Sequence, residues 1–143
     1  MKLKAIILSC LLACVVQLHA KEDPIDVAMD AAMGPAMERD GSTEGQIAVF
    51  KQAQVKWEAR LNSVYRLLKT SMGAEEFGAL QQAQRAWLVY REKQLVSLES
   101  SCSKICPGTR WIPFYEREVM LLTRARVQDL EGLVELVNER GNY

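Results

Sequence analysis

The feature that most constrains the fold is a six-residue unit that occurs twice. The pattern Gln-Ala-Gln-x-x-Trp spans residues 52–57 and returns at residues 82–87. Each copy lies in a ladder of mainly apolar residues spaced three and four apart, which is the pattern of one face of an α-helix. The first ladder consists of Ile47, Phe50, Gln54, Trp57, Leu61, Val64, Leu68 and Met72. The second consists of Phe77, Leu80, Gln84, Trp87, Arg91, Leu95 and Leu98.

The residues between the ladders predict how the two helices are joined. Gly73 suits the left-handed conformation that often ends a helix, and Glu75 and Glu76 suit the positive N-terminus of the next one. We therefore predict two long helices, up to about residue 72 and over residues 74–99, folded back on each other as a hairpin. In this arrangement each helix is the lengthwise partner of the other.

The remaining segments predict two more helices. Residues 21–38 form a short or kinked first helix, because a Gly-Pro pair interrupts the apolar stripe. Thr43 followed by Gln46 has the form of a capping box at the start of the second helix. A fourth helix follows an Ile-Pro pair and runs over about residues 113–140. No stretch alternates with period two for long enough to predict a strand. The predicted fold class is therefore all-α, an antiparallel helical bundle with two long central helices forming a hairpin, a short first helix and a C-terminal helix.

The start of the chain has the layout of a secretory signal peptide. Two lysines precede an apolar run from Ala5 to Val16, which is too short to span a bilayer, and Ala20 ends the segment. Cleavage of residues 1–20 leaves residues 21–143, which we interpret as one domain, periplasmic or secreted. The alternative is a lipobox at residues 11–14, in which Cys14 is lipidated and anchors the protein to a membrane.

The composition of residues 21–143 excludes several classes of function. Without the two lysines of the leader, 16 basic residues face 18 acidic ones, so nothing here attracts nucleic acid. The sole histidine, His19, lies in the leader, which excludes histidine-based catalysis and most zinc sites. The pairs Glu75/Glu76 and Glu116/Glu118 are interpreted as partners of helix dipoles rather than catalytic acids. We therefore predict a non-enzymatic protein with no catalytic residues, cofactor or metal.

Two cysteines remain after the leader, Cys102 and Cys106. They lie in residues 100–109, which have loop composition throughout. Cysteines four residues apart on a helix stand too far apart to bond, whereas in a loop they can meet. In an oxidising compartment we expect a small local disulfide between them. The alternative, a zinc site, needs four ligands and finds two thiols.

Four side chains of the repeat are candidates for packing or binding. The repeat places Trp57 and Trp87 on the same seam between the two helices of the hairpin, and core packing is the preferred role over stacking on a ligand. Gln54 and Gln84 are expected to make hydrogen bonds that set the register of the helices.

Arg91 falls on the inward face one turn after Trp87. A buried guanidinium requires a carboxylate or several carbonyls. The candidate partners are Glu116, Glu118 and Asp129 of the fourth helix. The alternative is that Arg91 forms a site for an acidic ligand.

Three short motifs follow one another along the chain. They are Trp57-x3-Leu61-Asn62-x2-Tyr65, Gln84-x2-Trp87-x2-Tyr90-Arg91 and Leu122-Thr123-x2-Arg126. Together they resemble the signature of the LprI-like family of bacterial envelope proteins, over about residues 25–136. The resemblance implies an exported, all-helical domain and, from the member that gives the family its name, inhibition of lysozyme. The chain departs from the family in lacking its usual cysteines and in having Glu92 after Arg91, so a Cys102–Cys106 bond would be a replacement private to this chain.

Residues and resemblance together favour an exported, non-enzymatic binding protein that blocks a muramidase. The protein partner would be a lysozyme or another muramidase, whose cleft holds two carboxylates. The 100–113 loop is the candidate binding element, through Lys104, Arg110 and Trp111. One alternative is an immunity or adaptor protein that binds a specific toxin or envelope partner. Another is a structural envelope protein that associates with itself.

Overall fold

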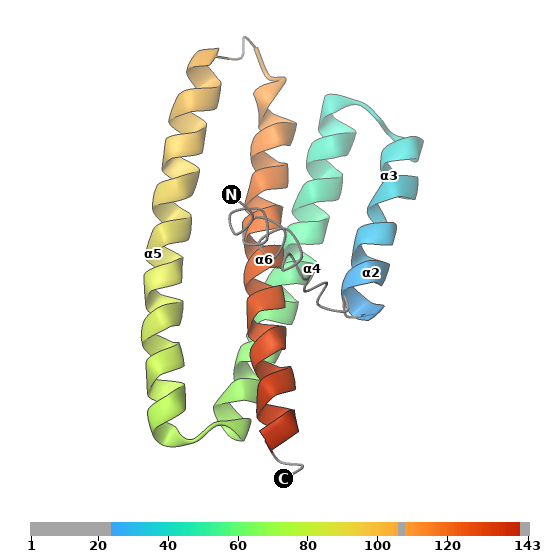
Figure 1. Ribbon diagram of the computed structural model, residues 1–143. Helices are drawn as coiled ribbons and strands as arrows, with labels where there is room; N and C mark the ends of the chain where they lie inside the picture. Colours follow the sequence, from blue (N-terminus) through green and yellow to red (C-terminus); the bar gives the residue numbers. More distant parts are fainter. Residues whose placement is uncertain (1–23, 106–107, 141–143) are drawn as a thin grey trace, which may run out of the picture.

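A computed structural model describes residues 24–105 and 108–140 of the chain. It contains the helices α2 (Pro24–Ala31), α3 (Met33–Arg39), α4 (Thr43–Ser71), α5 (Ala74–Ile105) and α6 (Trp111–Arg140) (Figure 1). No strand occurs in the described residues, and the predicted all-α class is confirmed. The predicted leader and Cys106 lie outside the described residues.

The first predicted helix is divided, as its Gly-Pro pair indicated. The break lies at Ala32, between α2 and α3, and the Ala32 amide still donates to the Ala28 carbonyl at 3.2 Å. Pro35 falls in the first turn of α3, where backbone amides have no partner within the helix and a proline is tolerated.

The cap of α4 lies one residue before the predicted one. Ser42, not Thr43, is the N-cap, and its hydroxyl accepts a hydrogen bond from the Gly45 amide at 3.0 Å. Gln46 reaches back to the Gly41 carbonyl at 2.8 Å. Gly45 is required here, because a Cβ at this position would lie 2.3 Å from Cγ of Asp40.

The turn between α4 and α5 uses Gly73 differently from the prediction. Gly73 does not adopt a positive φ; in the described residues Gly108 does, at 73°. Gly73 is instead the cap of α5. Its carbonyl accepts from the Phe77 amide at 2.9 Å, and its amide donates to the Glu76 carboxylate at 3.0 Å. Glu76 at the third helical position thus supplies half of a capping box.

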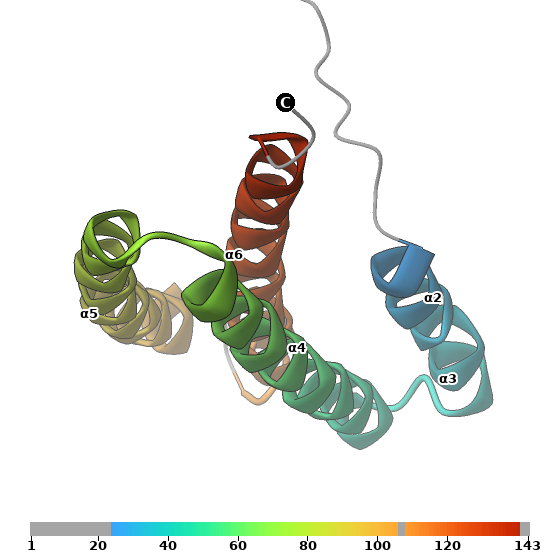
Figure 2. The same cartoon turned by 90° about the horizontal axis from the view of Figure 1, so that it is seen from below.

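The lengthwise partner of α4 is α6, which corrects the predicted pairing of α4 with α5. Helices α4 and α6 run in the same direction, because the residue numbers increase along both helices from one contact to the next. The contacts are Lys51–Glu116, Gln54–Thr123 and Arg60–Glu131. Helix α5 runs antiparallel to both and stands on one side of the α4–α6 pair, while α2 and α3 lie on the other (Figures 1 and 2). The inward face of α5 carries long polar side chains, so α5 packs less closely than α6 does.

The buried core lies mainly between α4 and α6. Its members are Ala53, Trp57, Leu61, Val64, Leu68, Leu80, Met120, Val127 and Leu130. Five of these belong to α4 and three to α6, whereas Leu80 is the one contributed by the described part of α5. Burial of each large apolar side chain contributes about 1.5–3 kcal/mol, so these two helices carry most of the apolar stabilisation.

Among the described residues, no helix combines the length and the apolar character needed to cross a bilayer.

Candidate functional site

A network of polar side chains joins α4, α5 and α6 at mid-height of the bundle. We call Gln54, Glu58, Arg91 and Thr123 the polar network. Arg91 Nη1 of α5 donates to Glu58 Oε1 of α4 at 2.5 Å and to the Thr123 hydroxyl of α6 at 3.4 Å. Gln54 Nε2 donates to the same Glu58 oxygen at 2.9 Å and to Thr123 at 3.0 Å. Thr123 is fully buried, so the network links three helices through one interior hydroxyl.

The partner of Arg91 is Glu58, not one of the residues predicted from the fourth helix. Glu116 pairs with Lys51, Glu118 with Arg117, and Asp129 with Arg126. The predicted structural pairing of Arg91 is thus present, with a carboxylate of α4. Gln54 and Glu58 are four residues apart on one face of α4, and this spacing was the sequence signal for a polar patch opposite Arg91.

A second cluster surrounds Trp87 on the α5 side. The Arg91 guanidinium lies 4.8 Å from the Trp87 ring centroid, and the Arg126 guanidinium lies 5.9 Å from it. Arg126 Nε donates to the Gln84 amide oxygen at 2.9 Å. The ion pair of Arg126 with Asp129 is weak, because Arg126 Nη1 lies 3.7 Å from Asp129 Oδ2 and the Asp129 side chain is 68% exposed. Each guanidinium is close enough to the Trp87 ring for a favourable cation–π interaction.

Trp57 and Trp87 do not share the seam that the repeat predicts. Trp57 is fully buried between α4 and α6, with the Arg124 guanidinium 5.8 Å from its ring centroid. Arg124 in turn pairs with Asp30 of α2 at 2.6 Å, so α2 is fastened over this part of the core. Trp87 is half-buried on α5 and packs against the edge of the core. Both are packing residues, but at different depths.

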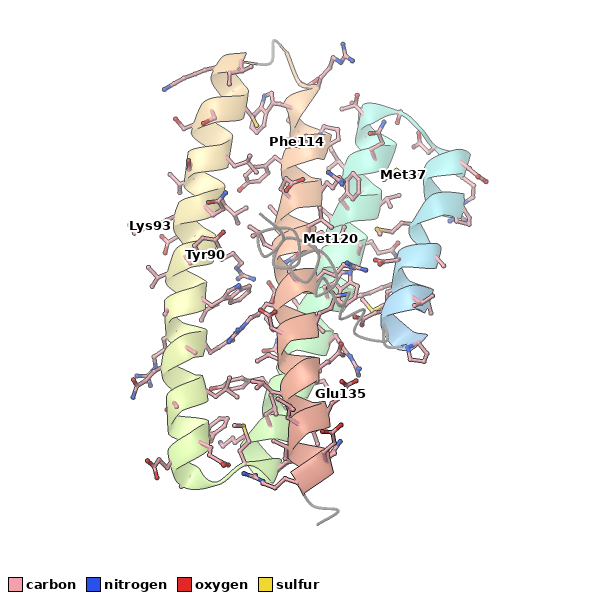
Figure 3. The ribbon with its side chains drawn as sticks, viewed as in Figure 1. Met37, Tyr90, Lys93, Phe114, Met120 and Glu135 are labelled. Atoms are coloured by element: carbon pink, nitrogen blue, oxygen red, sulfur yellow. The ribbon has the colours of Figure 1, made fainter. Side chains whose placement is uncertain are left out.

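The remaining motif residues have structural positions in the bundle. Leu61 is buried, Asn62 donates to the Glu58 carbonyl at 2.9 Å, and Tyr65 packs on Phe77 with ring centroids 5.4 Å apart. Leu122 is half-buried on α6. Tyr90 differs, because its side chain is 53% exposed on α5 (Figure 3).

The chemistry of the polar network is that of a structural joint. Its single carboxylate, Glu58, already accepts from Arg91 and Gln54, so the network offers no pair of acids for proton transfer. In the described part of the chain, no three His, Cys, Asp or Glu side chains gather in a way that could hold a metal ion. The polar network can hold α5 in place against the α4–α6 pair.

The predicted 100–113 loop is mostly helical. Helix α5 continues to Ile105 and α6 begins at Trp111, so the connection is shorter than its composition indicated. Lys104 and Arg110 are exposed on either side of the turn. Trp111 is half-buried and meets Tyr115 edge-on at 6.1 Å between ring centroids.

Cys102 is buried in the last turns of α5, with its side chain 9% exposed. The sequence signal for this helical extension was present, because Leu95, Leu98 and Cys102 continue the ladder with the same spacing. The disulfide was predicted on the premise that both cysteines lie in a loop, and Cys102 is instead helical. Since Cys106 lies outside the described residues, the Cys102–Cys106 disulfide stays a prediction.

Tyr115 lies partly buried near this turn, and burial affects its phenol. Burial raises the pKa of the Tyr115 phenol above its ordinary value, and the nearby carboxylates of Glu99 and Glu116 add to the increase. The phenol therefore stays neutral and keeps its proton throughout the physiological range.

Comparison with known proteins decides the family. The family model described as lysozyme inhibitor LprI matches residues 35–130, which is more than half of the chain. The chain belongs to the LprI family. The match is shorter at both ends than the resemblance predicted, yet it includes all three motifs and the whole polar network. No curated protein and no solved structure matches the chain.

The LprI match also gives the polar network a context. Residues of two separate motifs meet at the junction of α5 and α6. They are Gln84, Trp87, Arg91, Thr123 and Arg126. In this chain the family motifs therefore build the joint between helices, while the exposed Lys104 and Arg110 lie outside those motifs.

Proposed function

We propose that this protein is a non-enzymatic inhibitor that binds a lysozyme-type muramidase and blocks its cleft. The observation that carries the proposal is the family match over residues 35–130, whose description is that of a lysozyme inhibitor. The chemistry of the polar network supports it, because Glu58 is engaged in pairing helices rather than placed beside a second acid.

The binding element in this proposal is the connection between α5 and α6. Lys104 and Arg110 are exposed there, and their positive charges suit a cleft that contains two carboxylates. Trp111 is half-buried against Tyr115, so its role in this proposal is to support the turn.

Inhibition of cell-wall lysis tests the proposal. Purified protein comprising residues 21–143 is mixed with a panel of lysozymes of different folds, and the clearing of a bacterial cell-wall suspension is followed. We expect concentration-dependent inhibition of at least one muramidase. A cell-wall amidase, which cuts peptide rather than glycosidic bonds, is the control and should keep its full rate. If every muramidase keeps its rate, the proposal is wrong, and pull-down from a periplasmic extract then tests the adaptor alternative.

We also propose that residues 1–20 are removed on export and that Cys102 and Cys106 then form a local disulfide. Intact-mass measurement of the exported protein tests both statements. The expected product starts at Lys21 and gains mass on thiol alkylation only after reduction. A product that starts at a lipidated Cys14 would replace the first statement, and free alkylation without reductant would contradict the second.

A further inference from the structure

The end of the bundle where α5 stops and α6 starts exposes apolar side chains. Ile105, the last residue of α5, is 77% exposed. Phe114, in the first turn of α6 and labelled in Figure 3, is 45% exposed. Single exposed apolar residues are common on protein surfaces. Here the two occur at the two ends of one short connection, and Ile105 is more exposed than any other large apolar side chain in the described residues.

The same end carries two cations, and the carboxylate that precedes them is Glu99, which lies near Tyr115. Residues 100–115 contain Lys104 and Arg110 and no aspartate or glutamate. The nearest carboxylates that follow, Glu116 and Glu118, are paired with Lys51 and Arg117. Within the described part of the chain, neither Lys104 nor Arg110 has an ion pair, so their charges face solvent.

The side chains at this end are presented on a supported frame. Gly108 adopts a φ of 73°, which only glycine adopts without strain, and the Ile112 amide closes the turn on the Thr109 carbonyl at 3.0 Å. Pro113 is buried beneath, and Trp111 packs on Tyr115. These contacts hold the backbone of residues 108–113, so little ordering of that backbone would be needed on binding, which favours affinity.

We infer that the exposed side chains of Lys104, Ile105, Arg110 and Phe114, here called the α5–α6 end, enter the substrate cleft of the muramidase. This inference rests on the proposed function and specifies which surface makes the contact. The two cations face the carboxylates of the cleft, and the two apolar side chains pack against the walls that otherwise hold the sugar rings. Charge complementarity selects this occupant over an apolar or a basic partner.

Two pairs of double variants test the inference. Lys104→Glu/Arg110→Glu reverses the charges of the α5–α6 end, and Arg85→Glu/Lys93→Glu makes the same change in net charge on exposed positions of α5, where Lys93 projects from the outer side (Figure 3). Ile105→Ser/Phe114→Ser removes the apolar contacts. Val55→Ser/Val96→Ser makes the matching change at side chains that are 70% and 62% exposed elsewhere.

Both inhibition of lysis and direct binding to a catalytically inactive muramidase are measured for each variant, with circular dichroism as the check of folding. We expect the two variants of the α5–α6 end to bind at least about tenfold more weakly and the two controls to stay within about twofold of wild type. Raising the salt concentration should weaken the wild type but not the charge-reversed variant.

The outcomes separate the inference from the proposed function. If the wild type inhibits and the α5–α6 end variants inhibit equally well, the inference is wrong, together with the binding element named under the proposed function, while inhibition of a muramidase itself stands. If the control variants lose binding instead, another face makes the contact and the inference is again wrong. If the wild type neither binds nor inhibits any muramidase, both are overturned.

Discussion

At the scale of single residues, the sequence predicted which face a side chain occupies but not which partner it meets. The spacing of the ladders placed Gln54, Gln84 and Arg91 inward, and all three make interhelical hydrogen bonds. The partner of Arg91 was not predictable, because helical periodicity fixes a direction around one axis and says nothing about which helix lies opposite. In the folded bundle the carboxylate that reaches Arg91 is Glu58 of α4.

The two tryptophans of the repeat should contribute unequally to stability, and Trp57 should contribute more than Trp87. Trp57→Ala should lower the free energy of unfolding by about 3–5 kcal/mol, because the indole is fully buried in the closest-packed part of the core. Trp87→Ala is the matched control, and a half-buried indole should cost roughly half as much. Urea unfolding followed by circular dichroism measures both. Equal losses would show that the two tryptophans are buried alike.

Arg91 and Glu58 should be energetically coupled. Arg91→Gln and Glu58→Gln each break the same ion pair, so the double variant should be more stable than the sum of the single losses indicates, by about 0.5–3 kcal/mol. A double-mutant cycle based on chemical unfolding provides the measurement. Arg91 combined with Lys69→Gln, a change at an exposed position of α4, is the control and should be additive. Additivity between Arg91 and Glu58 would mean that the pair contributes nothing to stability.

At the scale of elements, the ends of helices were harder to predict than their existence. The ladders located α4 and α5, and a Pro-containing start located α6. The serine-rich composition of residues 100–103 indicated a loop, yet these residues are helical because Cys102 behaves as a small apolar side chain and buries itself on the inward face. Gly73 was assigned to the end of α4 because its role as the cap of α5 depends on Glu76 folding back onto it.

The start of α5 should make stability depend on pH. Hydrogen bonds from Arg140 and from the Gly73 amide hold the pKa of Glu76 below its ordinary value of 4.5. Because the folded-state pKa is the lower one, this contribution is complete above pH 4.5 and is lost as the pH falls through the folded-state value.

Glu76→Gln should therefore be less stable than wild type at neutral pH, and the gap should close in acid. Chemical unfolding at a series of pH values below and above 4.5 measures the gap. Glu92→Gln, at an exposed position in the middle of α5, is the control and should follow the wild-type curve. A gap that is constant with pH would show that the Glu76 contacts with Arg140 and Gly73 do not persist in solution.

At the scale of the whole molecule, the class of fold followed from periodicity, whereas the order of packing did not. The predicted hairpin of α4 and α5 is present in the chain order and direction of these helices, but the core formed between α4 and α6. The reason is the inward face of α5, where Gln84, Trp87 and Arg91 need room and hydrogen-bond partners. Two aliphatic faces exclude water more completely than one aliphatic and one polar face do.

Hydrogen exchange should show that α5 opens more readily than α4 and α6. Helix α5 has 32 residues, of which Leu80 and Cys102 are buried, so opening it exposes little apolar surface. We expect the amides of α5 to exchange faster than those of α4 and α6 under native conditions. Residues 53–68 of α4 serve as the internal reference, since they line the core. Equal protection of all three helices would mean that the bundle opens only as one cooperative unit.

The three tryptophans lie in different surroundings, so tryptophan fluorescence can report on different parts of the bundle. Trp57 is fully buried, Trp87 lies close to two guanidinium groups, and Trp111 lies at the start of α6. Replacing any two of them by phenylalanine leaves a single emitter. The wavelength of its emission and its access to a soluble quencher then report on the core, on the contact between α5 and α6, or on the start of α6, so that loosening of each region can be followed separately.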